Sequence, residues 1–381
     1  MKEVLDASGL PRPQFPVPPA CYTNQKPLII AEIGTSHGGD IKKAIELVDA
    51  VAETGADCAK FQCVYADEIV HPNTGSVPLP GGPVPIYERF KALELGEDFY
   101  AAVKERAESK GLLFLCTPFG LKSARLLRRI GVRAMKIASP ELNHLPLIDE
   151  LASYGLPTLV SSGVSTIADI ERALSHLACP TLLLHCVTAY PAPAEEYNLR
   201  LLRSLQAVFG RPTGVSDHSL DPVLVPSLAM AMGAVAVEKH ICLSRQDPGL
   251  DDPIALPPDD FRQMVLSARR AAEAGPETTI GEMSERFGAE TVRRVLGDGV
   301  KRLAPSEAQN YTRTNRSIHA LCAIKKGEEF TVENLALLRT EKVLRPGLKP
   351  DLLTHVLGRL ARRDIDSGEG IEWEDVGDIA P

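Results

Sequence analysis

The sequence predicts an α/β protein built from a (β/α)8 TIM barrel followed by a smaller β-rich domain. Short apolar runs alternate with amphipathic helical stretches from Pro27 to about Ala274, and there are eight such runs. Continuous apolar strands that alternate with helices indicate a parallel sheet covered by helices on its outside. Eight units in about 250 residues match the size of a TIM barrel. An open doubly wound sheet is the alternative, but no Gly-x-Gly-x-x-Gly motif follows the first strand.

The individual strands and helices of the barrel follow from hydrophobic periodicity. Residues 41–55 and 99–111 carry apolar side chains at i, i+3 and i+4, and each segment ends in a glycine, as helices commonly do. The candidate strands are residues 27–34, 58–63, 112–119, 134–139, 157–163, 181–188, 212–218 and 234–241.

Composition divides the chain into four segments. Residues 1–26 form a Pro-rich N-terminal extension, 27–276 the barrel, 277–311 a linker and 312–381 the β-rich domain, whose short strands are separated by KKGE, RPGLKP and DSGEG turns. Residues 64–98 form a long Pro- and Gly-rich connection after the second strand. Loops of this length in compact domains are usually functional, so we expect a lid over the active face of the barrel.

Bulk composition excludes several classes of function. A net charge of −8 over 381 residues disfavours nucleic acid or an anionic membrane as the main partner. No run approaches the roughly 20 apolar residues of a membrane span, and the N-terminus has no apolar signal core. The eight cysteines are scattered without a CxxC pair. We therefore expect a cytoplasmic protein with buried, reduced thiols, in which a local cluster of cations would hold any anionic substrate.

Polar side chains gather where the predicted strands end, which is where TIM-barrel enzymes carry their active sites. These groups can bind an anion, a metal ion or a proton. In chain order they include Glu32, Thr35, Ser36, His37, Lys60, Gln62, Thr117, Lys136, Ser139, Glu141, Ser161, Ser162, His185, Thr188, Tyr190, Ser216, Asp217, His218, Glu238, Lys239 and His240.

Three lysines stand inside apolar strands. Lys60, Lys136 and Lys239 would be costly to bury unless each pairs with a carboxylate or faces a ligand. One interpretation is structural pairing with a barrel carboxylate such as Glu32 or Glu238. The other is a phosphate clamp in which converging lysines and serine hydroxyls act by charge and hydrogen bonding.

Two histidines end adjacent predicted strands. His218 and His240 could approach one metal ion, leaving positions open for water and substrate, as suits a divalent Lewis acid. They could equally hydrogen-bond directly to a substrate. His185 lies deeper in an apolar run, so we expect it to be a core residue.

The ordered motifs AEIGTSHGGD, KFQ, LCTPF, MKIAS, SSG, HCVTAYPAP, GVSDH, EKH and DPGLD resemble those of the sialic acid (N-acetylneuraminate) synthases and their pseudaminate and legionaminate relatives. The tail, from NRSIHALCAIKKGEEFTVENL to GRLARRDIDSGEGI, is similar to the antifreeze-like SAF domain of those enzymes. The resemblance covers about Pro27 to the C-terminus.

This resemblance implies condensation of phosphoenolpyruvate with the open-chain aldehyde of an N-acylated hexosamine, with release of phosphate. It implies Mn²⁺ or Mg²⁺ at His218 and His240, and a glutamate near the reacting centre at Glu32. The positions that match phosphoenolpyruvate ligands are Lys60, Lys136, Ser139, Ser162, Thr188 and Ser216. Those that match the sugar side are Gln62, Glu141, Tyr190 and Asp251.

The same resemblance implies a domain-swapped homodimer, in which the SAF domain of one protomer caps the other barrel and Arg316 reaches the N-acyl group bound there. The sequence departs from the family at Ser36 and Gly38, where asparagines are usual, and at Asp252 and Ala255, where histidine and serine are usual. Most departures fall on the acceptor side. They suggest a different aldehyde, such as an unusual amino sugar or a nucleoside aldehyde.

Two other readings remain. A 3-deoxy-octulosonate-8-phosphate synthase type of enzyme shares the barrel and phosphoenolpyruvate, but it acts on phosphorylated sugars and lacks the SAF tail. A non-catalytic scaffold would be expected to lose the metal and phosphate positions, whereas Lys60, Lys136, His218 and His240 are all retained.

Overall fold

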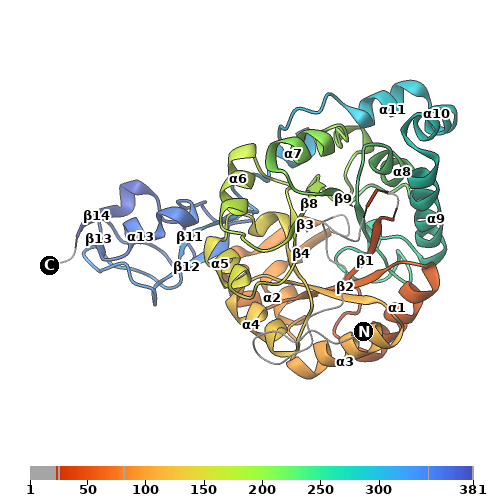
Figure 1. Ribbon diagram of the computed structural model, residues 1–381. Helices are drawn as coiled ribbons and strands as arrows, with labels where there is room; N and C mark the ends of the chain where they lie inside the picture. Colours follow the sequence, from red (N-terminus) through yellow and green to blue (C-terminus); the bar gives the residue numbers. More distant parts are fainter. Residues whose placement is uncertain (1–22, 25, 80–81, 342, 380–381) are drawn as a thin grey trace.

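The computed structural model describes residues 23–24, 26–79, 82–341 and 343–379, and shows a barrel with a small domain at its side (Figure 1). The Pro-rich extension predicted for residues 1–26 lies almost entirely outside these ranges, as does Cys21. The barrel strands are β1 (Leu28–Gly34), β2 (Cys58–Cys63), β5 (Leu113–Pro118), β6 (Met135–Ile137), β7 (Thr158–Ser161), β8 (Thr181–Cys186), β9 (Thr213–Asp217) and β10 (Ala236–His240).

These strands form one parallel sheet in the order β5-β2-β1-β10-β9-β8-β7-β6. The two end strands, β5 and β6, contact each other and so bring the sheet round into a barrel. All eight predicted strands and the predicted TIM-barrel class are confirmed. Because the strands are parallel, their carboxyl ends meet at one face of the barrel.

Helices surround the sheet, as Figure 1 shows. α1 (Ile41–Thr54) illustrates why they form where they do: the Asp40 side chain accepts a hydrogen bond from the Lys42 amide at its start, and Gly55 ends it with φ 83°. The others in the ring are α3 (Glu97–Ser109), α4 (Leu121–Arg129), α5 (Leu145–Ser153), α6 (Ile167–Ser175), α7 (Leu201–Phe209), α8 (Leu224–Ala231) and α9 (Pro258–Ala274).

Successive side chains on a strand point to opposite faces of the sheet, so alternate residues of each barrel strand belong to two different apolar layers. Ile30, Leu115 and Leu184 belong to a buried cluster inside the barrel. Ile29 and Leu183 stand one residue before Ile30 and Leu184, and they belong to the larger cluster between the sheet and the helices. The barrel interior is therefore a packed core, and polar side chains are left for the strand ends.

The long connection after β2 folds onto the carboxyl end of the barrel, where the sequence predicts a lid. It contains β3 (Ser76–Leu79), β4 (Gly82–Pro85) and α2 (Ile86–Lys91). Its buried residues Val64, Ile69 and Val70 pack against Phe119, the residue that follows β5. The connection thus covers the ends of β2 and β5.

The small domain is β-rich, as predicted. β11 (Arg316–Ala320) pairs antiparallel with β12 (Leu335–Arg339), and β13 (Arg359–Ala361) pairs antiparallel with β14 (Val376–Ile379). With α13 (Leu353–Val356) they enclose a separate apolar core. In Figure 1 this domain, in blue, lies beside α5.

The segment 277–311, which the sequence predicts as a linker, contains most of α10 (Pro276–Phe287), α11 (Ala289–Leu296) and α12 (Pro305–Ala308). α10 packs against α8 and α9 on the outside of the barrel.

Among the described cysteines six are buried free thiols, whereas Cys322 is an exposed free thiol, so the expectation of burial is wrong for that residue. No helix in the described part of the chain is long and apolar enough to span a membrane.

Candidate active site

Two lysines and two glutamates meet at the mouth of the barrel. Lys60 Nζ lies 2.8 Å from Glu32 Oε2 and 3.3 Å from Glu238 Oε1. Lys136 Nζ lies 3.8 Å from the same Glu238 oxygen and donates a hydrogen bond to Ser161 Oγ at 2.7 Å. The interpretation that Lys60 pairs with barrel carboxylates is therefore confirmed as a contact, and the lysine convergence expected of a phosphate clamp is present as well.

The charge states in this cluster follow from burial and pairing. Burial lowers the pKa of Lys136 to about 8, although Glu238 opposes that shift. Burial also disfavours the charged form of Lys60, but Glu238 and Glu32 outweigh it and raise the pKa of Lys60 above its ordinary value. Burial would raise the pKa of Glu238, but Lys136 and Lys60 lower it to about 2. Of these two lysines, Lys136 is the one that loses its charge more easily as pH rises.

Hydroxyl groups line the next part of the mouth, at the ends of β6, β7 and β8. Ser139 Oγ accepts a hydrogen bond from the Gly163 amide at 3.0 Å, and Ser162 Oγ donates to the Leu184 carbonyl at 3.1 Å. A Cβ added at Gly163 would lie 2.1 Å from Thr188 Oγ1 and 3.0 Å from Ser139 Oγ. Only a glycine leaves space between these side chains. We call the hydroxyls of Ser139, Ser162 and Thr188 around Gly163 the hydroxyl cradle. Ser216, on β9, donates to Glu238 Oε1 at 3.1 Å.

The two histidines lie close together. The ring centroids of His218 and His240 are 5.6 Å apart, and Tyr190 stacks on His218 with centroids 4.3 Å apart. His240 Nδ1 is buried without a hydrogen-bond partner, and burial lowers the pKa of His240 to about 3. Burial would lower the pKa of His218, but Cys186 and the Val187 carbonyl raise it to about 9.

This donor set fits a divalent ion held by two imidazoles. His240 is neutral, and an orphaned buried nitrogen is a ready metal ligand. His218 Nδ1 contacts the Val187 carbonyl at 2.9 Å, which leaves Nε2 for another partner. Because its pKa is raised to about 9, His218 would release a proton on binding the ion. No group of three or more His, Cys, Asp or Glu side chains in the described ranges could hold a metal, so the other ligands would be water and substrate.

A third group of side chains lies around Gly34, where β1 ends. Gln62 Nε2 donates to Glu32 Oε1 at 2.7 Å. A Cβ at Gly34 would lie 3.2 Å from Gln62 Nε2, 3.5 Å from Glu32 Oε1 and 3.7 Å from Asp251 Oδ2. Asp251 Oδ2 is also 3.9 Å from His240 Nδ1. Two predicted acceptor-side residues, Gln62 and Asp251, therefore converge with Glu32 beside His240.

The residues at which the sequence departs from the family pattern follow the two ends of this group in the chain: Ser36 and Gly38 come after Gly34, and Asp252 and Ala255 come after Asp251. Asp252 is fully buried; burial raises its pKa, and the nearby Ser36 hydroxyl opposes that shift. Its Oδ2 accepts from the Gly249 amide at 2.9 Å, while Oδ1 and Ser36 Oγ are buried without a hydrogen-bond partner. Gly38 has φ 58°, a backbone conformation that glycine and asparagine both tolerate. Ala255 is buried and its amide bonds the Asp251 carbonyl.

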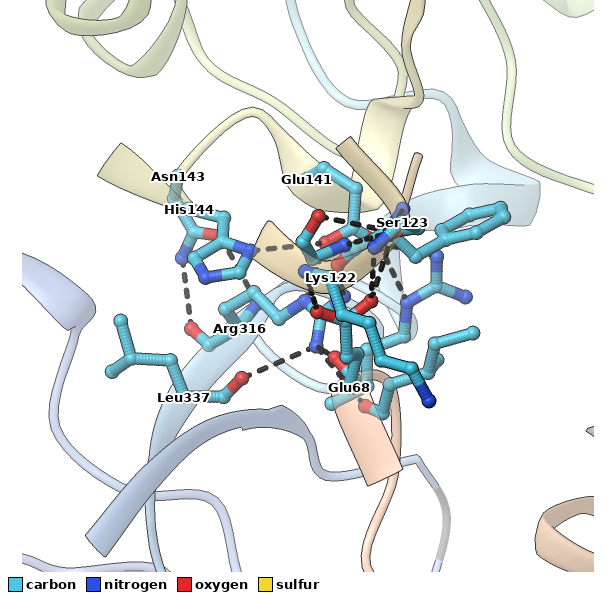
Figure 2. A network of polar contacts seen from close by, with 12 residues as sticks. Glu68, Lys122, Ser123, Glu141, Asn143, His144, Arg316 and Leu337 are labelled. Carbon is cyan, nitrogen blue, oxygen red and sulfur yellow. Dashed lines mark hydrogen bonds and ion pairs between the residues drawn. The ribbon is translucent and has the colours of Figure 1, made fainter. Parts of the chain in front are cut away.

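Arg316, from the small domain, is buried against its own barrel (Figure 2). Its Nε pairs with Glu141 Oε2, and Nη2 donates to the Phe119 carbonyl at 2.6 Å. Arg339 Nη2 pairs with the other Glu141 oxygen at 2.5 Å, and Asn143 bonds both backbone polar groups of Arg316. Burial would raise the pKa of Glu141, but the two arginines hold it well below its ordinary range.

The same arginine also holds the lid connection. Arg316 Nη1 donates to the Glu68 carbonyl, while the Glu68 side chain accepts hydrogen bonds from the amides of Lys122 and Ser123 at the start of α4. Figure 2 shows Glu68, Lys122, Ser123 and Arg316 in one network of polar contacts. Arg316 and Glu141 are thus brought together. The contact predicted with an N-acyl group stays a prediction.

Two strand-end residues point away from the site. Lys239 Nζ contacts Asp217 Oδ2 at 2.6 Å and the Ser219 hydroxyl at 3.4 Å, which is structural pairing. His185 Nε2 contacts the Tyr197 carbonyl at 2.5 Å, as expected of a core histidine. The sequence placed Glu238 at a strand end and offered it as a partner for the lysines, but predicted no catalytic or binding role for it. Strand alternation could have found it, because Glu238 and His240 share one face of β10 and Lys239 faces the other way.

Comparisons with known proteins identify the family of this chain. The NeuB family model matches residues 47–279 and the SAF domain model matches residues 315–377. The N,N'-diacetyllegionaminic acid synthase of Legionella pneumophila is 32% identical over 360 residues, covering 91% of this chain and 94% of that protein. The crystal structure of the spore coat polysaccharide biosynthesis protein SpsE of Bacillus subtilis has a TM-score of 0.77 and 32% identity, covering 95% of this chain and 98% of that one.

A sialic acid synthetase structure from Leptospira borgpetersenii has a TM-score of 0.61 and 30% identity, covering 75% of this chain and 90% of that chain. The family model covers more than half of the chain, and the small domain has its own match. The chain is therefore a member of the NeuB family, with a TIM barrel followed by a SAF domain.

Proposed function

We propose that the protein condenses phosphoenolpyruvate with the open-chain aldehyde of an N-acylated amino sugar, giving a nonulosonic (sialic-type) acid and phosphate with the help of Mn²⁺ or Mg²⁺. Its similarity to a legionaminic acid synthase and a sialic acid synthetase supports this class of product. The single observation that carries the proposal is the meeting of Lys60 and Lys136 at Glu238, two residues before His240. A cationic phosphate site and a pair of imidazoles thereby share one barrel mouth.

The phosphate of the substrate would be held by Lys136 and the hydroxyl cradle. Lys60 already faces two carboxylates, so its charge is largely balanced, whereas Lys136 has Glu238 at 3.8 Å. A phosphate near Lys136 gains a charge-assisted hydrogen bond and favours its protonated form. Ser139 and Thr188, which crowd Gly163, would donate hydroxyl protons to the remaining phosphate oxygens. Ser162 and Ser216 lie on the flanking strand ends.

His218 and His240 would hold the divalent ion, which when bound polarises the aldehyde carbonyl as a Lewis acid. C3 of phosphoenolpyruvate would attack the aldehyde carbon, whose oxygen becomes a hydroxyl, and water would add to C2. Glu32, held by Lys60 and Gln62, would accept a proton from that water, and the C2–O bond to phosphate would then break to leave the keto group. Gln62 and Asp251 would orient the sugar next to it, and Tyr190 would pack against the sugar from the His218 side. Glu32, Lys60, Glu238 and His240 are buried, and this burial strengthens the contacts among them.

The aldehyde that accepts the enolpyruvate carbon has two candidates. Asp252 and Ser36 place two buried polar groups, each with an unpartnered oxygen, beside the predicted sugar side. Such groups favour a ligand that supplies hydrogen-bond donors there. The alternative is the same condensation with another aldehyde, an unusual amino sugar or a nucleoside aldehyde.

We also propose that the protein acts as a domain-swapped homodimer. A swap exchanges an identical element between protomers, so the contacts of Arg316 and Arg339 with Glu141 within one chain are the contacts that a swapped pair would make between chains. Light scattering coupled to size-exclusion chromatography should give twice the chain mass. A monomeric mass would overturn this part alone.

The reaction is tested by a phosphate-release assay with phosphoenolpyruvate, Mn²⁺ and a panel of aldehydes that includes N-acetylmannosamine, 2,4-diacetamido sugars and nucleoside aldehydes. The proposal predicts release that depends on one of the N-acylated sugars. Release with nucleoside aldehydes but with no N-acyl sugar would support the second candidate. A folded, metal-loaded protein that released phosphate with none of them would contradict both.

A further inference from the structure

The turn after β7 contains a strained residue. Val164 has φ 41°, in the left-handed region that β-branched side chains rarely adopt. The turn also carries Ser162 and Gly163, both part of the hydroxyl cradle described above. Strained backbone persists only where surrounding contacts over-determine it. The contacts that do so here come from outside the barrel.

Residues 301–315, which we call the strap, supply those contacts. Within the strap, Glu307 has 1% of its surface exposed. Its Oε2 accepts hydrogen bonds from the Val164 amide at 3.0 Å and from the Thr188 amide at 2.8 Å, and its Oε1 accepts from the Ala304 amide at 3.2 Å. Asn315 Nδ2 donates to the Val164 carbonyl at 3.2 Å. Both backbone polar groups of Val164 are therefore held by strap side chains.

The strap contacts extend over two strand ends. Lys301 Nζ donates to the Ser162 carbonyl at 3.1 Å, and Asn310 Nδ2 contacts the Thr188 carbonyl at 3.4 Å. Each of Ser162, Val164 and Thr188 is thus bonded through its backbone to the strap. The single carboxylate of Glu307 spans the β7 and β8 turns, which lie next to each other in the sheet.

The spacing of these two turns sets the shape of the cradle. A Cβ at Gly163 would lie 2.1 Å from Thr188 Oγ1, so small shifts of either turn change the distances among the hydroxyls. Catalytic and binding groups must be held to within a fraction of an ångström by the residues behind them. The strap provides that support, and it runs directly into β11, which begins at Arg316.

We propose that Glu307 is a positioning residue for the phosphate of phosphoenolpyruvate: it fixes the β7 and β8 turns from outside the barrel and so ties the cradle to the placement of the SAF domain. The ligand in this inference rests on the proposed function. A carboxylate suits the task because its two oxygens accept the Val164, Thr188 and Ala304 amides together.

The test compares Glu307→Ala, Glu307→Gln and the matched control Gln309→Ala, which removes an exposed side chain of the same strap. Amide hydrogen exchange of peptides that span Val164 and Thr188 is measured without substrate. The KM for phosphoenolpyruvate and the KM for the acceptor are measured separately. Glutamine keeps an oxygen that can accept from both turn amides, whereas alanine leaves these amides buried without an acceptor.

We expect Glu307→Ala to speed exchange at both turns and to raise the KM for phosphoenolpyruvate by about tenfold or more, since a lost buried hydrogen bond changes an equilibrium by about that factor. The KM for the acceptor should change by less than about twofold. Glu307→Gln should restore most of the loss, and Gln309→Ala should match the wild type. Unchanged exchange in Glu307→Ala, or an equal rise in both KM values, would overturn the inference.

The exchange arm separates this inference from the proposed function. If the wild type released no phosphate from phosphoenolpyruvate, the proposed function and the ligand assigned here would both fail, while exchange would still decide whether Glu307 holds the turns. If Glu307→Ala does not fold, Glu307→Asp serves instead, because its side chain is one methylene shorter and would not reach the Val164 and Thr188 amides together. Exchange at Val164 as slow as in the wild type would then contradict the inference.

Discussion

Lys136 and Glu238 come from strands that are not neighbours in the sheet, yet Lys136 Nζ lies 3.8 Å from Glu238 Oε1 inside the barrel mouth. The same oxygen lies 3.3 Å from Lys60 Nζ and accepts from Ser216. Glu238 is therefore the point at which the predicted phosphate ligands meet. It precedes His240 by two residues on the same strand, so the lysine pair and the histidine pair lie at the same end of β10.

The charge of Lys136 predicts how activity depends on pH. Burial lowers its pKa to about 8, so Lys136 is an ammonium below that pH and neutral above it. An ammonium attracts phosphate and a neutral amine does not, so kcat/KM for phosphoenolpyruvate should fall as pH rises through about 8. Lys136→Arg, which stays charged, should lose this alkaline limb. A profile that stays flat through pH 8 in the wild type would remove Lys136 from the phosphate site.

Neutralising Glu238 should lower the pH at which kcat/KM for phosphoenolpyruvate begins to fall. In Glu238→Gln, Lys136 loses the carboxylate that raises its pKa, so the fall in kcat/KM should begin at lower pH than in the wild type. The value at the optimum should drop by roughly a hundredfold, as when a preorganised electrostatic contact is removed. Ser216→Ala is the control, since it removes a hydroxyl contact to Glu238 but no charge. An unshifted limb in Glu238→Gln would show that Glu238 does not control Lys136.

Removing one imidazole should abolish turnover without unfolding the protein. His240→Ala takes away a buried side chain whose Nδ1 has no partner within the described residues, so its loss breaks no hydrogen bond of that nitrogen. We expect Mn²⁺ affinity measured by calorimetry to fall sharply, with a melting temperature close to that of the wild type. His355→Ala, which removes an exposed histidine of the SAF domain, serves as the control. Activity like that of the wild type in His240→Ala would break the metal assignment.

The sequence was sufficient to predict the barrel because each strand is marked by a local run of apolar residues. Apolar runs define the eight strands, and parallel strands bring Lys60, Lys136, His218 and His240 to one face whatever the details of packing. The direction of Lys239 was left open, although strand alternation with His240 would have turned it away from the site.

Contacts between distant segments had no such signal. Arg339 and Glu141 are 198 residues apart, and Glu307 and Val164 are 143 apart. Each pairing depends on how the SAF domain and the strap settle on the barrel, which neither periodicity nor motif spacing encodes. The strain at Val164 is equally invisible, since nothing in SSGVS marks a valine with positive φ.

Breaking the buried pair of Arg316 and Glu141 should lower both stability and acceptor binding. Arg316→Ala leaves a fully buried carboxylate with Arg339 and His144 as its remaining partners, at a cost of about 3–5 kcal/mol in the free energy of unfolding. Denaturant titration checks this, with the exposed Arg294→Ala as control. The KM for the acceptor should rise far more than that for phosphoenolpyruvate. Equal rises would place Arg316 away from the acceptor.

Acid should weaken the same pair in the wild type. The arginines hold the pKa of Glu141 below its unfolded value, so the stability that this carboxylate contributes is present above that unfolded value and is lost as pH falls through the folded one. Arg316→Ala should therefore lose less stability on acidification than the wild type does. Denaturant midpoints measured across the acid range test this, and parallel losses in the two proteins would contradict it.

The most direct test of the account measures phosphate and the new sugar acid in the same reaction. With phosphoenolpyruvate, an N-acylated aldehyde sugar and Mn²⁺, mass spectrometry should find one molecule of the condensed 2-keto acid for each phosphate released. Omission of either substrate or of the metal should stop both. Phosphate released in the absence of any aldehyde, with no carbon–carbon bond formed, would show hydrolysis instead and contradict the proposed condensation.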